Sequence, residues 1–379
     1  MARCRFGDVV REIKNSIDRE NNPYDYYIAG GHMDSEDLHI HRKGSFKTDD
    51  VGPAFIREFK KGQVLYGSRR TYLKKVAVAD FDGVTANTTF VLETKDENVL
   101  LQSLLPFVML SDSFTEWSIG KSKGSTNPYV LFSDLADYEF ELPPIEKQRT
   151  LAKLLWGIDS TKCSYKDLID KTDEVVKSQF IEMFGDTDNR ASLESLCTVF
   201  ADGDWIESKD QADEGIRLIQ TGNIGNAGYI DKEERARFIS YETFDRLSCT
   251  EVFPGDVLIS RLPDPIARCC IVPDIGRRAI TAVDCTIVRF KKEILPDYFE
   301  EYTLTPDYAL QIQDFVTGST RQRISRKNLG AVTVPVPDLE RQKVFVEIAH
   351  QSDKSKFELN EAIKDLDAMY KRVIKDNLG

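Results

Sequence analysis

The segment Pro-Pro-Ile-Glu-Lys-Gln-Arg at residues 143–149 occurs a second time, as Pro-Asp-Leu-Glu-Arg-Gln-Lys at residues 337–343. The two copies share a proline, a glutamate, a glutamine and a final basic residue at the same relative positions, 194 residues apart. An internal repeat constrains the architecture of the whole chain, so it is interpreted before any single motif.

Two other short motifs recur with nearly the same offset. Gly-Ser-Thr at residues 124–126 recurs at 318–320, and Lys-Gly-Gln-Val-Leu at 61–65 recurs as Pro-Gly-Asp-Val-Leu at 254–258. Three matches in one order indicate a duplication. The 379-residue chain is therefore expected to contain two tandem units.

A long, charged, glycine-poor segment follows each proline-rich motif. Apolar residues recur there in steps of three and four, which is typical of an amphipathic helix with a narrow apolar stripe. We expect the two helices to bury these stripes against each other as a two-stranded coiled coil, usually a spacer or an assembly surface. The predicted stripes comprise Leu151, Leu154, Ile158, Tyr165, Leu168, Thr172 and Val175 in the first helix, and Phe345, Ile348, Ser352, Leu359, Ala362, Leu366, Met369 and Val373 in the second.

The two larger segments contain short β-branched runs bounded by Gly, Asp and Pro, such as residues 61–68 and 285–290. This pattern predicts strands and turns, and helices are expected over 100–110 and 296–315, so each segment is predicted to be an α+β domain with an antiparallel or mixed sheet. The expected boundaries are 1–142 for the first domain, 143–185 for the first long helix, 186–336 for the second domain and 337–379 for the second long helix.

The composition, with 41% apolar and 30% charged residues, is that of an ordinary globular chain. No apolar run is long enough for a membrane span and the first residues lack a signal-peptide core, so we expect a soluble, cytoplasmic protein. The seven cysteines are odd in number and form no Cys-x-x-Cys pair, which favours reduced thiols over disulfides or a zinc site.

The net charge of −12 argues against attraction of the whole surface to nucleic acid. Basic residues are nevertheless concentrated in two windows. Residues 57–75 hold seven basic residues and a single acid, and residues 321–327 hold four basic residues and no acid. Local contacts with an acidic ligand are therefore still expected.

The doubled order of a Gly-(Asp/Gln)-Val-Leu strand, a Gly-Ser-Thr turn and a Pro-x-x-Glu-x-Gln-(Arg/Lys) helix start resembles the specificity (S) subunit of type I restriction-modification enzymes. The resemblance covers nearly the whole chain. It implies two tandem target-recognition domains, each of which reads one half of a split double-stranded DNA sequence. It also implies two antiparallel spacer helices with pseudo-two-fold symmetry. Gly62 and Gly255 match the turn before the central strand.

The same resemblance implies a non-catalytic subunit that docks methyltransferase subunits, expected to be two, and joins restriction/translocase subunits through the complex. S-adenosylmethionine, ATP and Mg²⁺ are expected in those partners, and no cofactor, metal or membrane in this chain. The residues that match the helix-start motif, and that are expected to take part in docking, are Pro143, Pro144, Glu146, Gln148, Pro337, Glu340 and Gln342.

Two similar domains on a stiff rod would present two contact patches at a fixed separation, which suits duplex DNA. Arginine can pair with guanine and lysine with phosphate. The candidate DNA-binding residues are Lys60, Lys61, Arg69, Arg70, Lys74 and Lys75 in the first half, and Arg261, Arg268, Arg277, Arg278, Arg321, Arg323, Arg326 and Lys327 in the second. The basic run after the second Gly-Ser-Thr turn has no first-half counterpart, because Asn-Pro-Tyr-Val-Leu-Phe occupies residues 127–132.

Catalytic alternatives find less support. Asp82, Glu93 and Lys95 fit the loose pattern of a metal-dependent nuclease, but the second copy carries Phe290 where Glu93 stands, so surface charge is favoured. Asn-Pro-Tyr at 127–129 partly matches an amino-methyltransferase motif. It lacks the second proline of that motif, however, and the chain has no glycine-rich loop for the methyl-donor cofactor, so a turn is favoured.

Three histidines near the start of the chain offer possible metal ligands. His32, His39 and His41 lie among acidic residues, but no neighbour suggests the outer shell that orients metal ligands, so a polar loop is favoured. The chain has no Walker A motif and no evident nucleophile–base pair. The alternative function left open is a non-catalytic coiled-coil scaffold or adaptor whose two domains bind protein, supported by the acidic pI near 5.1.

Overall fold

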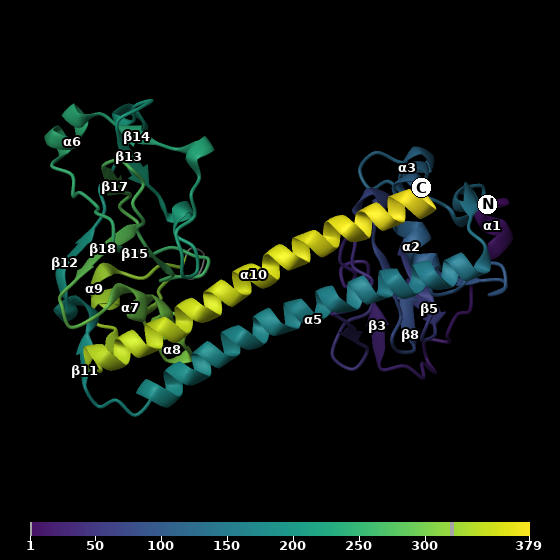
Figure 1. The fold of residues 1–379 in the computed structure, drawn as a ribbon, viewed down its shortest axis with the longest axis horizontal. Coiled ribbons are helices and arrows are strands. Elements are labelled where there is room, and N and C mark those ends of the chain that lie inside the picture. The colour runs from purple at the N-terminus through teal and green to yellow at the C-terminus, as the bar shows by residue number, and fades with distance from the viewer. Residues whose placement is uncertain (1, 319–321) are drawn as a thin grey trace. The chain divides into compact units, whose positions relative to one another are not determined.

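The computed structural model describes residues 2–318 and 322–379, and the chain divides into two compact units (Figure 1). Unit 1 comprises residues 1–166 and 360–379, and unit 2 comprises residues 167–359. Each unit therefore contains part of both long helices. These helices are α5 (Ile145–Phe184) and α10 (Leu339–Leu378), each 40 residues long.

Unit 1 contains two four-stranded sheets and one two-stranded ribbon. The first sheet has the order β2-β9-β6-β7 and is antiparallel throughout. The second has the order β4-β3-β8-β5, in which β3 and β8 are parallel, and β1 pairs with β10. The strands are β1 (Ala2–Arg5), β2 (Val10–Ile13), β3 (Tyr26–Ile28), β4 (Gly44–Ser45), β5 (Phe55–Phe59), β6 (Val64–Gly67), β7 (Val76–Val78), β8 (Gly83–Ala86), β9 (Thr89–Thr94) and β10 (Glu139–Leu142).

Short helices cover the first sheet of unit 1. Every residue of α2 is buried, because its side chains pack into the core between the sheet and the long helices, where Phe107 contacts Trp156 and Tyr370. The helices are α1 (Phe6–Val9), η1 (Thr71–Leu73), α2 (Leu105–Leu110), α3 (Asp112–Lys121) and α4 (Phe132–Ala136).

Unit 2 repeats this plan. Its sheets have the orders β12-β18-β15-β16 and β14-β13-β17, with β13 and β17 parallel, and β11 pairs with β19. The strands are β11 (Arg190–Ser192), β12 (Cys197–Asp202), β13 (Ile216–Ile219), β14 (Phe238–Ile239), β15 (Val257–Ser260), β16 (Cys269–Ile271), β17 (Ala279–Thr281), β18 (Cys285–Phe290) and β19 (Thr333–Pro335). The helices are η2 (Leu193–Leu196), η3 (Ser208–Asp210), η4 (Thr221–Asn223), η5 (Glu233–Arg235), α6 (Tyr241–Leu247), α7 (Pro296–Tyr302), α8 (Pro306–Phe315) and α9 (Arg326–Gly330).

The duplication extends to single hydrogen bonds. Helix α3 starts where the Ser111 hydroxyl accepts from the Phe114 N–H, and α8 starts where the Thr305 hydroxyl accepts from the Tyr308 N–H, both at 3.3 Å. The expectation of two tandem domains of mixed helix and sheet is therefore confirmed.

Within unit 2, the two long helices run antiparallel. Phe184, at the end of α5, contacts Phe345 near the start of α10, and Asp173, further back along α5, pairs with Lys356, further along α10, at 2.7 Å. In unit 1, Lys162 of α5 forms an ion pair with Asp367 of α10.

The predicted apolar stripe is wrong at several positions. Leu154, Leu168 and Val175 are 45%, 48% and 60% exposed. Leu151 and Ile158 of the predicted stripe are buried, as expected. The buried apolar residues of α5 are those that face the domain cores: Leu151, Ala152, Leu155 and Ile158 in unit 1, and Val176, Phe180 and Phe184 in unit 2. The reason is that each part of the helix packs onto the domain of its own unit, and this contact selects the face that is buried.

All seven cysteines are free thiols, as expected. Burial raises the pKa of Cys249 and Cys285 to about 11, so both stay protonated near neutral pH. Across residues 2–318 and 322–379, no helix has both the length and the apolar character needed to cross a membrane.

Candidate nucleic-acid interface

Two loops meet at the same place in each unit. In unit 1, Lys123 and Tyr129 close a hairpin by exchanging backbone hydrogen bonds of 2.8 and 2.9 Å. This hairpin contacts the loop after β6, because the Val130 N–H donates to the Ser68 carbonyl at 2.9 Å. In unit 2, Thr317 and Arg323 exchange two bonds of 3.0 Å, and the Ile324 N–H donates to the Arg261 carbonyl at 3.2 Å. Residues 319–321, which include Arg321, lie outside the described part of the chain.

The loop of unit 1, residues 68–75, holds the side chains of Ser68 and Thr71 inward and several others outward. Thr71 is buried, and its hydroxyl lies 3.3 Å from that of Ser122. On either side, Arg70 and Lys74 adopt left-handed backbone conformations with φ of 51° and 47°, which turn the chain sharply around η1. Arg69, Arg70 and Tyr72 are exposed as a result.

The two exposed arginines are supported by residues that the sequence analysis did not select. The Arg69 guanidinium lies over the Tyr129 ring at 5.9 Å, and the Arg70 Nε donates to the Asn127 side chain at 3.3 Å. Both supports come from the hairpin. The repeat offset could have identified Tyr129, because Arg323 stands 194 residues later and both residues close their hairpins.

The four candidate lysines of unit 1 differ in their surroundings. Lys74 pairs with Asp112 at 2.8 Å and with Glu36 at 3.4 Å. Lys60 pairs with Glu58 at 3.0 Å and contacts the Tyr24 hydroxyl, and these contacts raise the pKa of Lys60. The Lys75 ammonium donates to the Gly30 carbonyl, whereas Lys61 is exposed at the turn before β6.

Arg261 and Arg268 of unit 2 hold their own loop together. Arg261 is 5% exposed, donates to the Val283 carbonyl at 2.6 Å and pairs with Asp202 at 3.4 Å, and desolvation lowers its pKa. Arg268 donates to four backbone carbonyls at 2.7–3.1 Å, those of Thr221, Ile224, Leu262 and Pro265. In this conformation neither guanidinium is presented to a base.

Three exposed candidates of unit 2 lie at the end of the hairpin and at the start of α9. Arg323 pairs with Asp284 at 2.9 Å, Arg326 donates to the Phe200 carbonyl at 3.1 Å, and Lys327 is exposed. Arg277 and Arg278 lie elsewhere in the unit: Arg277 pairs with Glu233 at 3.3 Å, and Arg278 makes two bonds of 2.7 and 2.8 Å to Glu251. The two units therefore share a backbone construction but present different side chains on it.

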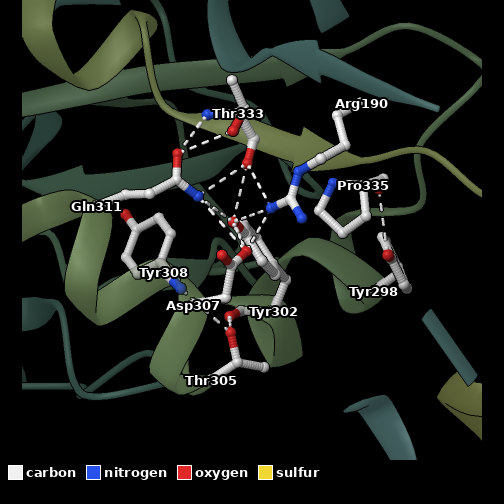
Figure 2. Close-up of polar contacts among 9 residues, drawn as sticks. All are labelled: Arg190, Tyr298, Tyr302, Thr305, Asp307, Tyr308, Gln311, Thr333 and Pro335. Carbon is white, nitrogen blue, oxygen red and sulfur yellow. Dashed lines mark hydrogen bonds and ion pairs between the residues drawn. The ribbon is translucent and has the colours of Figure 1, made fainter. Parts of the chain in front are cut away.

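A polar network around the buried Tyr302 holds α8, the helix that leads into the unit 2 hairpin, although Arg190, Asp307 and Thr333 are themselves exposed. Figure 2 shows Arg190, Asp307 and Gln311 converging on the Tyr302 hydroxyl and the Thr333 carbonyl. The Tyr302 hydroxyl lies 2.8 Å from Asp307 and 2.9 Å from the Thr333 carbonyl, and the Gln311 side-chain oxygen accepts from the Thr333 N–H at 2.8 Å. The start of the hairpin at Thr317 is thus anchored to the core of its unit.

The glutamines of the two helix-start motifs, Gln148 and Gln342, make equivalent hydrogen bonds in the two units. Gln148 accepts from the Leu101 N–H at 3.1 Å and donates to the Val99 and Pro143 carbonyls, both at 2.8 Å. Gln342 makes the equivalent bonds to Leu295, Glu293 and Pro337 at 2.8–2.9 Å. Both glutamines are buried, so they join the helix start to the domain and present no surface to a partner.

The other helix-start residues are divided between the core and the surface. Pro143 and Pro337 are buried, whereas Pro144 is exposed. The Glu146 and Glu340 side chains are 84% and 82% exposed.

The residues weighed for catalysis do not converge. Glu93 pairs with Arg11 and accepts from Gln63, whereas Asp82 accepts from the Lys61 N–H and Lys95 donates to the Gly7 carbonyl. The sheet pairing changes which residue of the second copy is equivalent to Glu93. Leu92 lies opposite Val64 and Val288 opposite Val257, so the counterpart of Glu93 is Arg289 and not Phe290. A carboxylate is still absent from that position of the second copy.

The chain is similar to known proteins in both sequence and fold. The family described as type I restriction modification DNA specificity domain matches residues 6–170 and 189–366. The specificity subunit of type I restriction enzyme EcoDI from Escherichia coli is 25% identical over 167 residues, which cover 44% of this chain and 35% of that protein. The MjaVIII specificity subunit from Methanocaldococcus jannaschii is 22% identical over 289 residues, 70% of this chain and 66% of that protein. The chain thus matches less than two thirds of the length of either relative.

One solved structure has a similar fold along the whole chain. It comes from work on complex assembly and conformational transition of the type I R-M system, and superposes with a TM-score of 0.64 at 19% identity, covering 100% of this chain and 97% of that one.

Proposed function

Because the chain belongs to the type I restriction modification DNA specificity domain family, we propose that it is the subunit that recognises the DNA target in a type I restriction-modification complex. In this role each unit reads one half of a bipartite sequence. The long helices set the spacer between the halves and dock the partner subunits.

The observation that carries the proposal is the doubled two-loop construction. Residues six apart, Lys123 with Tyr129 and Thr317 with Arg323, are paired and followed by equivalent backbone bonds to the loop after the central strand in both units. Yet the exposed donors differ: Arg69 and Arg70 lie on the first loop of unit 1, whereas Arg323 closes the hairpin of unit 2 and Lys327 lies in α9. A shared scaffold with different exposed donors suits two half-sequences that differ, because bases are distinguished by side-chain donors and acceptors in the major groove.

The helices suit the role of a spacer. A 40-residue helix is about 60 Å long at about 1.5 Å per residue. Both α5 and α10 have this length, and their antiparallel ion pairs and core contacts stiffen them along their course through each unit.

The helices also carry exposed apolar side chains that suit partner docking. Val175 and Met369 are equivalent in the repeat and are 60% and 44% exposed, and Phe357 is 65% exposed. Because each unit has such a surface, the proposal includes two methyltransferase subunits, with restriction/translocase subunits joining through the complex. S-adenosylmethionine, ATP and Mg²⁺ then belong to these partners, and this chain has no catalytic role of its own.

The net charge of −12 adds a requirement to this assignment. Phosphate neutralisation supplies much of the affinity of proteins for DNA. The partner subunits are therefore proposed to contribute many of the phosphate contacts, whereas this chain contributes mainly contacts with bases.

The test is reconstitution with the methyltransferase subunit of the native host. The purified complex is incubated with S-adenosylmethionine and a random-sequence DNA library, and methylated molecules are sequenced. The expected product is one bipartite sequence with a fixed spacer, and this chain alone should transfer no methyl group. Two results together would favour the protein-binding scaffold instead. The chain would fail to co-purify with a methyltransferase, and the logarithm of its DNA-binding constant would not fall linearly with the logarithm of salt concentration.

A further inference from the structure

Three side chains of different ligand types meet in unit 1, on the long helix and on the loop between β3 and β4. His39 comes from that loop, and Asp159 and Cys163 come from α5. Each residue offers one ligand atom: an imidazole nitrogen, a carboxylate oxygen or a sulfur. These three atoms lie within 4.8 Å of one another. The His39 Nε2 and an Asp159 oxygen are 2.6 Å apart.

We propose that His39, Asp159 and Cys163 bind a divalent transition-metal ion, with Zn²⁺ as the preferred occupant and a water molecule as fourth ligand. Imidazole, thiolate and carboxylate are the groups that bind Zn²⁺ in proteins. This assignment does not depend on the proposed role in DNA recognition.

The geometry needs only small movements to accept the ion. Bonds of about 2.0–2.3 Å to nitrogen, oxygen and sulfur place the ligand atoms of a tetrahedral site roughly 3.3–3.7 Å apart. The present separations between these ligand atoms range from 2.6 Å to at most 4.8 Å. Side-chain rotations that move the ligand atoms by about an ångström would therefore bring them to the tetrahedral spacing. Asp159 and Cys163 are four residues apart on one helix and therefore project from the same face.

The surroundings already orient the histidine. The Asp37 carboxylate accepts from the His39 backbone N–H at 2.9 Å and lies 3.1 Å from the His41 Nε2. The His39 and Asp159 side chains are 40% and 11% exposed, so the site combines a buried ligand with a path for the ion to enter.

Metal binding at this site replaces protons. The thiol of Cys163 loses its proton to solvent, the imidazole binds through Nε2 with its remaining proton on Nδ1, and Asp159 binds as the carboxylate. The two negative ligands balance the charge of Zn²⁺, and no oxidation or reduction takes place.

The ion would connect α5 to the basic loop of unit 1. His39 lies on the segment that includes Glu36, whose N–H donates to the Lys74 carbonyl at 3.2 Å and whose carboxylate pairs with the Lys74 ammonium at 3.4 Å. Fixing this segment to α5 therefore also restrains residues 68–75. The sequence favoured a polar loop because no residue near the histidines in the chain suggests an outer shell that orients metal ligands. Asp159 and Cys163 lie 120 residues or more from His39 along the chain.

The experiment is a cobalt titration of the full-length, chelator-treated chain. The wild type should bind one equivalent of Co²⁺, with a thiolate-to-cobalt charge-transfer band in the near ultraviolet, and Zn²⁺ should abolish the band by displacement. Cys163→Ser should lose the band while keeping its far-ultraviolet circular dichroism. His39→Gln should weaken Co²⁺ binding by roughly tenfold or more, because even loss of an outer-shell partner costs about 10- to 100-fold.

Cys4→Ser is the matched control, since Cys4 is another partly exposed cysteine of unit 1, and it should leave the titration unchanged. A wild type without the thiolate band, a Cys163→Ser variant that retains it, or a His39→Gln variant with unchanged affinity would each overturn the proposal.

Discussion

Replacing Arg69 by alanine should weaken recognition of one half of the DNA target and leave the other half unaffected. The guanidinium is exposed, stacks on Tyr129, and has no ion pair with an acidic side chain of the described residues. Meeting a guanine would therefore break no existing salt bridge. A bidentate contact of this kind contributes about 1–3 kcal/mol, which corresponds to a loss of about 5- to 150-fold in affinity.

Arg278→Ala is the matched control, because that guanidinium is already bound at two points to Glu251 and should change DNA affinity little. The assay is competition binding of the reconstituted complex at one salt concentration, with three duplexes: the full target, and targets in which the first or the second half is scrambled. The effect of Arg69→Ala should disappear on whichever duplex lacks the half that unit 1 reads.

Two results would refute the reasoning. Equal losses on target and random DNA would make Arg69 a phosphate contact, which carries no sequence information. No loss on any duplex would make it a surface charge.

Other predictions concern stability. Arg268→Ala should lower the melting temperature measured by calorimetry, since it removes one hydrogen-bond donor from each of four backbone carbonyls. Gln342→Leu should destabilise the chain by at least about 1–3 kcal/mol in denaturant unfolding, the cost of leaving the buried Pro337 carbonyl unpaired, whereas Gln351→Leu on the exposed face should have little effect. Burial raises the pKa of Glu300 and of Glu301 from 4.5 to about 7. Folding therefore favours their protonated forms, and the unfolding free energy should fall as pH rises from about 4.5 to 7, by no more than about 3 kcal/mol for each group. Glu300→Gln should reduce this pH dependence, and an identical pH profile would contradict the assignment.

Part of the architecture followed from the sequence because its signals are local. The motifs at 143–149 and 337–343 do begin long helices, at Ile145 and Leu339. The Gly-Asp-Val-Leu segment at 255–258 leads into the central strand β15 of its sheet. Turn residues and helix starts depend on a few neighbouring residues, and so they can be recognised without the tertiary structure.

The availability of the basic residues could not be predicted in the same way. Arg268 and Arg69 look alike in the sequence, yet the first is bound to carbonyls from η4 and from its own loop, whereas the second is exposed. The exposed faces of the long helices were mispredicted for a similar reason. Packing onto the domains, and not the steps of three and four residues alone, decides that Leu155 is buried and Leu154 is not. Each of these features depends on residues distant in the chain.

The central claim is that the long helices set the distance between two half-sequence readers. It is tested by inserting four helix-forming residues into both helices where the units divide, between Lys166 and Asp167 and between Leu359 and Asn360. The insertion lengthens each helix by about 6 Å and rotates its continuation by about 40°. At about 3.4 Å per base-pair step, this corresponds to nearly two base pairs.

The measurement is selection of methylated DNA by the reconstituted complex from a library in which the spacer length varies. The account predicts that both half-sequences are retained and that the preferred spacer becomes one or two base pairs longer, with some loss of affinity from the rotation. An unchanged spacer, with both half-sequences still selected, would contradict it.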